Sequence, residues 1–314
     1  MPPALSATRS ISQGVRSAPG PHQGCGIGCL PTHPSHGIQQ KIAGSPAGAA
    51  TVDPLARTNV VKDATTRFSC RVDLYVKHRP GYPPALIDFL ADVCNLRPAH
   101  VVADVGSGSG ALAEVFLRNG NAVYAIEPNP EMRAAAEHAL RGYSRFRSVD
   151  AVGERTTLPE RSVDLVAVGR AFHWLEPDTA LAEFARILKP EGWVVIIAFR
   201  RNTASPFLAE YEKLLSSFRT DRGRMRQRRR ALDQFLAANA FKTQTLPEER
   251  CLGREGLQGL TLSYSTSPAP DDPQAVSLLD AVDALFQKHQ RGGEVLVGHD
   301  VTIYHKQLGL SDNR

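Results

Sequence analysis

The sequence has few cysteines and no long apolar run, which argues against a disulfide-rich, zinc-stabilised or membrane-spanning protein. Five cysteines in 314 residues are odd in number and scattered, so no disulfide framework is predicted. Cys25 and Cys29 have no second pair to complete a zinc tetrahedron, and we predict no metal site. No apolar run approaches the ~18 residues that a membrane helix needs. A reducing compartment, the cytoplasm, is the expected location.

Acidic residues are absent before Asp53, where the chain is rich in Gly, Pro, Ser, Ala and His. Without hydrophobic periodicity, residues 1–66 are predicted to form a disordered low-complexity extension. A basic, serine-containing segment free of acids is also typical of an organelle transit peptide, although four prolines in its first 21 residues suit a targeting helix poorly. Both alternatives stay open, and residues 67–314 are expected to hold the folded domain.

The net charge of +5 is concentrated in two stretches of the chain. The segment before Asp53 contributes +3, and Arg219–Arg230 contributes +6 from seven arginines and Asp221, which leaves about −4 for the rest. Three hypotheses fit the arginine run: a solvated helix face or loop, a nearby anionic small substrate, and RNA or a membrane surface. No aromatic residue interrupts the arginines, which counts against stacking on single-stranded bases.

Residues 100–132 carry the clearest local pattern. Val101–Val105 is apolar and β-branched enough for a buried parallel strand. A turn containing three glycines, a helix over Ala111–Arg118 and a second strand over Ala122–Ile126 follow. This pattern predicts a βαβ unit, and in open α/β sheets the ligand binds at the carboxyl ends of the strands.

The residues at these strand ends indicate the ligand. The glycines let a ligand approach the main chain, and Glu127 can accept the hydroxyl hydrogens of a ribose. The same glycine spacing fits a dinucleotide, so an NAD(P)-binding oxidoreductase stays an alternative. Asp104, two residues before the turn, would repel a pyrophosphate but attract an ammonium or sulfonium group. Asp150 and Ala151 follow the next strand, Arg145–Val149, and suit the edge of an adenine.

The remaining pattern predicts alternating strands and helices. A fourth strand leads into a Phe-His-Trp turn, and a nearly continuous apolar fifth strand follows the next helix. The expected strands are Val163–Val168, Trp193–Phe199, Phe241–Thr245 and Val295–His305, and the expected helices are Ala85–Val93, Pro130–Leu140, Pro177–Leu188, Ser205–Phe218, Leu232–Ala240 and Asp272–His289.

Taken together, these motifs resemble the class I S-adenosylmethionine-dependent methyltransferases, and most closely the small-molecule branch that includes trans-aconitate and ubiquinone-pathway enzymes. The matching segments are Asp104–Gly110, Ile126–Asn129, Asp150-Ala151, Ser162–Val166 and Ala171–Trp174. The resemblance covers residues 68–200 well. It implies an α/β Rossmann-like, doubly wound sheet of seven strands in the order 3-2-1-4-5-7-6, with the last strand antiparallel. A helical cap is expected over about 68–95 and 203–290.

The resemblance also implies S-adenosylmethionine as cofactor and in-line transfer of its methyl group to an oxygen, nitrogen or carbon of a small molecule. The predicted cofactor-binding residues are Asp104, Gly106, Ser107, Gly108, Gly110, Glu127, Pro128, Met132, Asp150, Ala151, Arg170, Tyr75 and Arg79. For Met132, and for Tyr75 with Arg79, core packing and attachment of the loop stay alternatives.

On the acceptor side, Phe172, Trp174 and Tyr264 are expected to face the substrate. His173 is the candidate general base, because an imidazole near its usual pKa can take a proton at neutral pH. Contact with substrate or cofactor, and simple packing beside Trp174, are the alternatives. A catalytically inactive cofactor-binding or scaffold protein also stays open, since a binding motif does not prove turnover.

Overall fold

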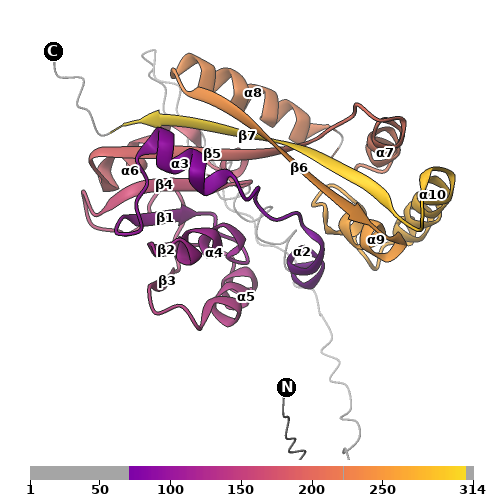
Figure 1. Cartoon of the computed structure of the whole chain (residues 1–314), viewed down its shortest axis with the longest axis horizontal. Coiled ribbons are helices and arrows are strands. Elements are labelled where there is room, and N and C mark those ends of the chain that lie inside the picture. Colours follow the sequence, from indigo (N-terminus) through magenta and orange to yellow (C-terminus); the bar gives the residue numbers. More distant parts are fainter. Residues whose placement is uncertain (1–70, 222, 309–314) are drawn as a thin grey trace, which may run out of the picture. The chain divides into compact units, whose positions relative to one another are not determined.

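The computed structural model describes residues 71–221 and 223–308 (Figure 1). The predictions for the N-terminal extension, including Cys25 and Cys29, lie outside the described residues. So do residues 67–70 at the expected start of the domain and Arg222 within the arginine run.

Seven strands form one sheet in the order β3-β2-β1-β4-β5-β7-β6, which confirms the predicted topology. Strands β1 to β5 pair in parallel, whereas β7 pairs antiparallel with both β5 and β6. The strands are β1 (Val101–Val105), β2 (Ala122–Ile126), β3 (Phe146–Val149), β4 (Val163–Gly169), β5 (Leu188–Arg201), β6 (Lys242–Leu252) and β7 (Val295–Gln307).

Helices connect the strands and cover the sheet (Figure 1). They are α2 (Val72–His78), α3 (Leu86–Cys94), α4 (Ala111–Arg118), α5 (Pro130–Leu140), α6 (Pro177–Ile187), α7 (Pro206–Ser217), α8 (Arg224–Ala238), α9 (Arg254–Ser263) and α10 (Pro273–His289), with a short 3₁₀ turn η1 (Phe172–Trp174).

Alternate residues of the central strands face two separate apolar cores, as expected for a parallel sheet covered on both sides. On one face, Val102 packs with Leu86 of α3 and Phe116 of α4. On the other face, Ala103 and Val105 share a core with α6 and α8. Since both faces are buried, the carboxyl ends of the strands are the natural edge for a ligand.

A third core lies in a separate group of helices, α7, α9 and α10, beside the ends of β6 and β7 (Figure 1). Leu257, Leu278 and Val297 are completely buried there. The Tyr211 hydroxyl and the Thr261 hydroxyl are 2.7 Å apart in the same core. These contacts give the cap a packed interior of its own.

Two elements near the arginine run differ from the sequence prediction. Helix α8 begins at Arg224 instead of Leu232, because Asp221 accepts hydrogen bonds from the backbone N–H groups of Gly223 and Met225, and arginine is a good helix former. Strand β6 extends to Leu252, well beyond the predicted end at Thr245, since it pairs with β7 over its whole length.

Helix α2 was not predicted, because the prolines after Arg79 indicated a broken loop. The helix ends before those prolines. The Arg71 guanidinium preceding it donates to the carbonyl oxygens of Tyr264 and Ser267. This anchorage joins α2 to the segment that follows α9. Among the described helices, none is both long and apolar enough to cross a membrane.

The cap core supplies a stability test with a matched control in one helix. Leu278 is fully buried in α10, whereas Val276 is 64% exposed two residues earlier. We expect Leu278→Ala to lower the free energy of unfolding by about 2–5 kcal/mol through lost burial and a residual cavity. Val276→Ala should change it by less than about 0.5 kcal/mol. Urea unfolding measures both, and equal effects would contradict the packing described for α10.

Candidate cofactor and substrate site

The glycine turn after β1 is held against the end of β2. The N–H groups of Gly106 and Ser107 both donate to the Ile126 carbonyl oxygen, at 2.8 and 3.1 Å. Gly106 has φ +67°, and a Cβ at this position would lie 2.4 Å from the Cβ of Ala171. A side chain would therefore disrupt both the backbone conformation and the contact with the turn after β4.

Glu127, at the end of β2, closes the other side of this turn. Its Oε2 accepts the Gly108 N–H at 2.9 Å and its Oε1 accepts the Asn129 N–H at 2.9 Å. Burial raises the pKa of Glu127, and these two backbone bonds lower it. Each carboxylate oxygen keeps acceptor capacity, so the group can still bind a pair of hydroxyls.

Asp104 is the most unusual acid among the described residues. It is 0% exposed, and neither carboxylate oxygen has a hydrogen-bond partner. Burial raises its pKa to about 8, and nearby Glu127 adds to the increase. The nearby Ala113 N–H offsets part of this increase in the pKa of Asp104. A buried carboxyl group of this kind favours a cationic partner.

A cavity of about 110 Å³ lies beside the turn and collects many of the predicted cofactor residues; we call it the cofactor cavity. Its lining includes Tyr75, Gly106, Gly108, Glu127, Pro128, Met132, Arg170 and Trp174. Asp104 near the end of β1, and Ser107 and Gly110 in the adjoining turn, are not among the residues that line this cavity. Ser107 is buried with its hydroxyl unpartnered, and Gly110 is the N-terminal cap of α4.

The structure places Asp150 away from this cavity. Its side chain is 69% exposed and forms an ion pair of 3.0 Å with Arg133. Neither Asp150 nor Ala151 is among the residues that line the cofactor cavity, whereas Val152, Gly153 and Glu154 are. The role of Asp150 at the adenine edge therefore stays a prediction, and the residues just after it lie closer to the cavity than the sequence pattern indicated.

A second cavity of about 80 Å³ adjoins the first and holds the aromatic turn after β4; we call it the aromatic cavity. Phe172, His173 and Trp174 line it together with Arg79 and Arg170. Burial lowers the pKa of His173 to about 3, and Arg229 and Arg228 add to the decrease. The imidazole is therefore neutral at physiological pH and a weak proton acceptor.

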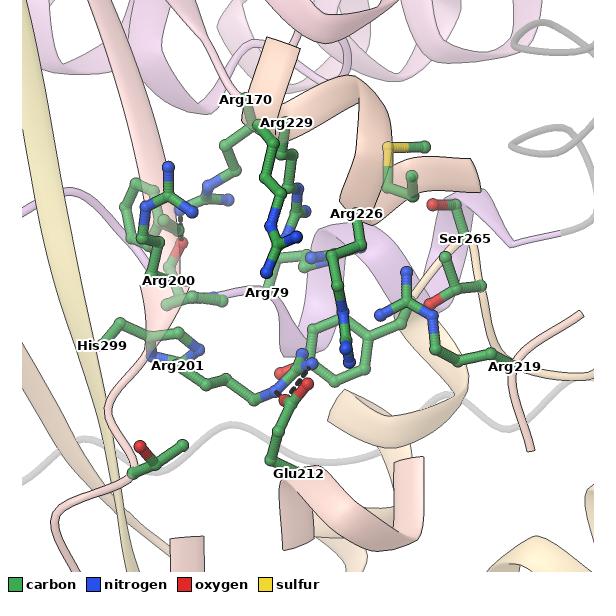
Figure 2. A pocket seen from close by; sticks show the side chains of 17 residues that line it. Arg79, Arg170, Arg200, Arg201, Glu212, Arg219, Arg226, Arg229, Ser265 and His299 are labelled. Atoms are coloured by element: carbon green, nitrogen blue, oxygen red, sulfur yellow. Dashed lines mark hydrogen bonds and ion pairs between the residues drawn. The ribbon is translucent and has the colours of Figure 1, made fainter. Parts of the chain in front are cut away.

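A third and larger cavity, of about 400 Å³, continues from the aromatic cavity (Figure 2). We call it the arginine cavity, because arginines from several elements line it together with Tyr264. The arginines are Arg79, Arg170, Arg200, Arg201, Arg219, Arg226, Arg229 and Arg230. Arg170 lines all three cavities and connects the predicted cofactor and substrate regions.

Sequence reasoning did not single out Arg200, Arg201 or Arg229 as individual site residues. Two signals in the sequence mark them. Arg200 and Arg201 end the apolar fifth strand, where open sheets bind ligands. Arg229 occupies the apolar stripe of α8, at helical spacing between the buried residues Met225 and Leu232.

Asp104 generates a prediction about the pH dependence of stability. The pKa of Asp104 is about 8 in the folded state, against the usual 3.8. The contribution of the protonated group to the free energy of unfolding is therefore fully present below about pH 4 and is lost as the pH rises through 8. We expect Asp104→Asn to stabilise the cofactor-free protein increasingly between these limits, by at most about 1.4 kcal/mol per pH unit. Urea unfolding at several pH values measures the difference.

Asp88→Asn provides the control for this experiment. Asp88 is an exposed acid on α3, so the variant removes a negative charge from the same domain without touching the glycine turn. A stability difference for Asp104→Asn that stays constant between pH 4 and pH 9 would contradict the buried, unpartnered state of this carboxyl group.

Comparison with known proteins shows that the central segment is similar to methyltransferases. Residues 103–196 match the model of a methyltransferase domain. The chain is 32% identical over 154 residues to an uncharacterized methyltransferase of Mycobacterium tuberculosis, covering 49% of this chain and 60% of that protein. It is 30% identical over 156 residues to an uncharacterized methyltransferase of Schizosaccharomyces pombe, covering 48% and 60%. The matched region thus spans less than two thirds of these relatives.

The fold is also similar to that of a solved methyltransferase structure. A solved structure from Anaeromyxobacter dehalogenans, described as a type II methyltransferase, superposes with a TM-score of 0.56 over 73% of this chain and 98% of its own, at 22% identity. The antiparallel β7 between β5 and β6 also departs from the dinucleotide-binding order 3-2-1-4-5-6. The predicted resemblance is confirmed at this level: residues 103–196 match the methyltransferase domain model, and the sheet has the strand order of the class I methyltransferase fold.

Proposed function

We propose that this protein is an S-adenosylmethionine-dependent methyltransferase that acts on a small molecule. The observation that carries the proposal is the buried, unpartnered carboxyl group of Asp104 beside the glycine turn and Glu127. The family match supports methyl transfer, and this acid supports a cationic donor over a pyrophosphate.

The residues present fit the proposed cofactor. Asp104 supplies a buried carboxyl group whose ionised form the ammonium of the methionine part would stabilise, and Glu127 supplies acceptors for ribose hydroxyls. Gly106 and Gly108 leave the main chain open to close approach. Met132 and Trp174 offer apolar surface in the same cavity. By comparison, two phosphates would face two buried acids here.

When bound, S-adenosylmethionine supplies a methyl group that the acceptor's lone pair takes, while the electrons of the broken carbon–sulfur bond stay on sulfur. The chain's own task is alignment and exclusion of water. Arg170 holds one wall: its guanidinium lies 3.8 Å from the ring centroid of Phe199 and donates to the Pro80 carbonyl oxygen. Trp174 lines both the cofactor and aromatic cavities, so an acceptor in the second faces the first.

His173 lies in the aromatic cavity as a neutral imidazole. With a pKa of about 3, the imidazole accepts protons poorly, and in our proposal His173 contacts the acceptor without deprotonating that acceptor. A carboxylate acceptor, already ionised, would need no base. The atom methylated, and membership in the trans-aconitate and ubiquinone-pathway branch, stay predictions.

Calorimetric titration with S-adenosylmethionine and S-adenosylhomocysteine tests the proposal. We expect Glu127→Ala to weaken both by about tenfold or more, because a hydrogen bond to a charged group contributes roughly 1.5–3 kcal/mol. Glu131→Ala, an exposed acid at the start of α5, is the matched control and should leave affinity unchanged.

Three further results decide between the alternatives. Failure of the unmodified protein to bind either compound, or binding of NAD(P) in their place, would overturn the proposal. Release of S-adenosylhomocysteine in the presence of an acceptor would distinguish an enzyme from an inactive scaffold. Asp150→Ala tests the adenine-edge prediction by itself: an unchanged affinity would remove that residue from the site and leave the other assignments standing.

A further inference from the structure

The arginine cavity brings together positive charges that are far apart in the sequence. Its eight arginines come from the end of α2, the turn after β4, the end of β5, the segment before α8, and α8 itself. Figure 2 shows the guanidinium groups of Arg79, Arg170 and Arg229 turned toward the same space. Glu212 is the one carboxylate among the described lining residues.

Only part of this charge is neutralised by the chain. Arg200 pairs with Asp233, Arg201 with Glu212, and Arg219 with Asp221. The other five cavity arginines form no ion pair with a described acid. They are Arg79, Arg170, Arg226, Arg229 and Arg230.

Holding these cations together is unfavourable without a counter-charge. Burial lowers the pKa of Arg229 to about 10, and Arg201, Arg200, Arg219 and Arg79 add to the decrease. Its place in the apolar stripe of α8, between buried Met225 and Leu232, also leaves this cation partly removed from water. An uncompensated cluster of this kind marks a binding site for a ligand of opposite charge.

The donors available in the cavity match an oxyanion. Arg79 and Arg170 line this cavity, and their Nε–H groups, which are shielded from solvent, have no hydrogen-bond partner. Guanidinium groups bind carboxylate and phosphate oxygens through two parallel N–H donors. Five guanidinium groups line the cavity without an ion pair, of which Arg226 and Arg230 are exposed to water; together they exceed what a single carboxylate can neutralise, so the cavity suits a ligand with several negative charges.

The cavity geometry favours a small molecule over RNA or a membrane surface. A volume of about 400 Å³ is that of a small-ligand pocket. The Tyr264 ring, which could otherwise stack on a base, already contacts the guanidinium groups of Arg79 and Arg201, each 4.7 Å from its centroid. The Phe199 ring is covered by Arg170 in the same way.

We propose that the methyl acceptor is a small organic polyanion whose phosphate or carboxylate groups bind in the arginine cavity while its reactive atom extends through the aromatic cavity. This inference rests on the proposed methyltransferase function and adds the substrate class. Arg170 is the shared wall, so it contacts acceptor and cofactor together.

Binding of simple anions tests the inference. Inorganic diphosphate and citrate are titrated into the full chain saturated with S-adenosylhomocysteine, with sodium chloride at equal ionic strength as reference. Diphosphate and citrate distinguish a phosphate from a carboxylate ligand. We expect one of them to bind, and Arg229→Met and Arg226→Met each to weaken it by about tenfold through a lost charge-assisted bond.

Arg224→Met is the matched control on the same helix. Arg224 is exposed and lies outside the described lining, so its loss should change anion affinity by less than about twofold. Arg229→Met should bind S-adenosylhomocysteine normally, because Arg229 is absent from the described lining of the cofactor cavity. Arg226 is exposed, so its variant keeps the test valid even where Arg229→Met fails to fold.

The outcomes separate this inference from the proposed function. If S-adenosylhomocysteine binds but neither anion does, the substrate class is wrong and the methyltransferase proposal stands. If S-adenosylhomocysteine does not bind the unmodified protein, the proposed function fails first. An RNA oligonucleotide or anionic vesicle that binds more tightly than both anions, with equal losses for Arg224→Met and Arg229→Met, would assign the arginines to a surface and overturn the inference.

Discussion

The parallel pairing of β1 with β2 and β4 is the constraint on which the candidate site depends. Its register places Asp104 opposite Ala125 and Ala167, so these three strands end at the same edge. The glycine turn, Glu127 and the turn containing Arg170 therefore meet within one region. Because α3 and α4 cover one face and α6 and α8 the other, this edge is where the sheet can receive a ligand.

The two ends of the site have opposite electrostatic character. Two acidic side chains, Asp104 and Glu127, lie at the cofactor cavity, and burial raises the pKa of both, whereas arginines line the arginine cavity. Asp104 has no hydrogen-bond partner among the described residues, and ion pairs with described acids neutralise only three of the eight cavity arginines. In the proposed reaction a cationic donor and an anionic acceptor supply the opposite charges, and Arg170 lies between them.

Such unpaired groups lower the stability of the free protein, so the surrounding structure has to hold them in place. The sheet does this for Asp104, whose strand lies between two neighbours. The cap does it for the arginines: Arg79 donates to the Ser263 carbonyl oxygen, and Arg201 pairs with Glu212 of α7. The third core, which includes Leu278, therefore supports the wall of the arginine cavity as well as the stability of the cap.

The sequence alone determined the central strands, the glycine turn and, through the family resemblance, the order of the sheet, because apolar periodicity and turn chemistry are local properties. It also pointed to several of the residues that line the cofactor cavity. Only the tertiary structure decided where the arginine run lies. Packing of Leu232 and Leu236 on the sheet sets the rotation of α8 and so turns Arg229 into the cavity, beside Arg200 from a distant strand. The tertiary structure also directs Asp150 toward Arg133, because the orientation of a side chain at a strand end depends on neighbours that sequence spacing does not specify.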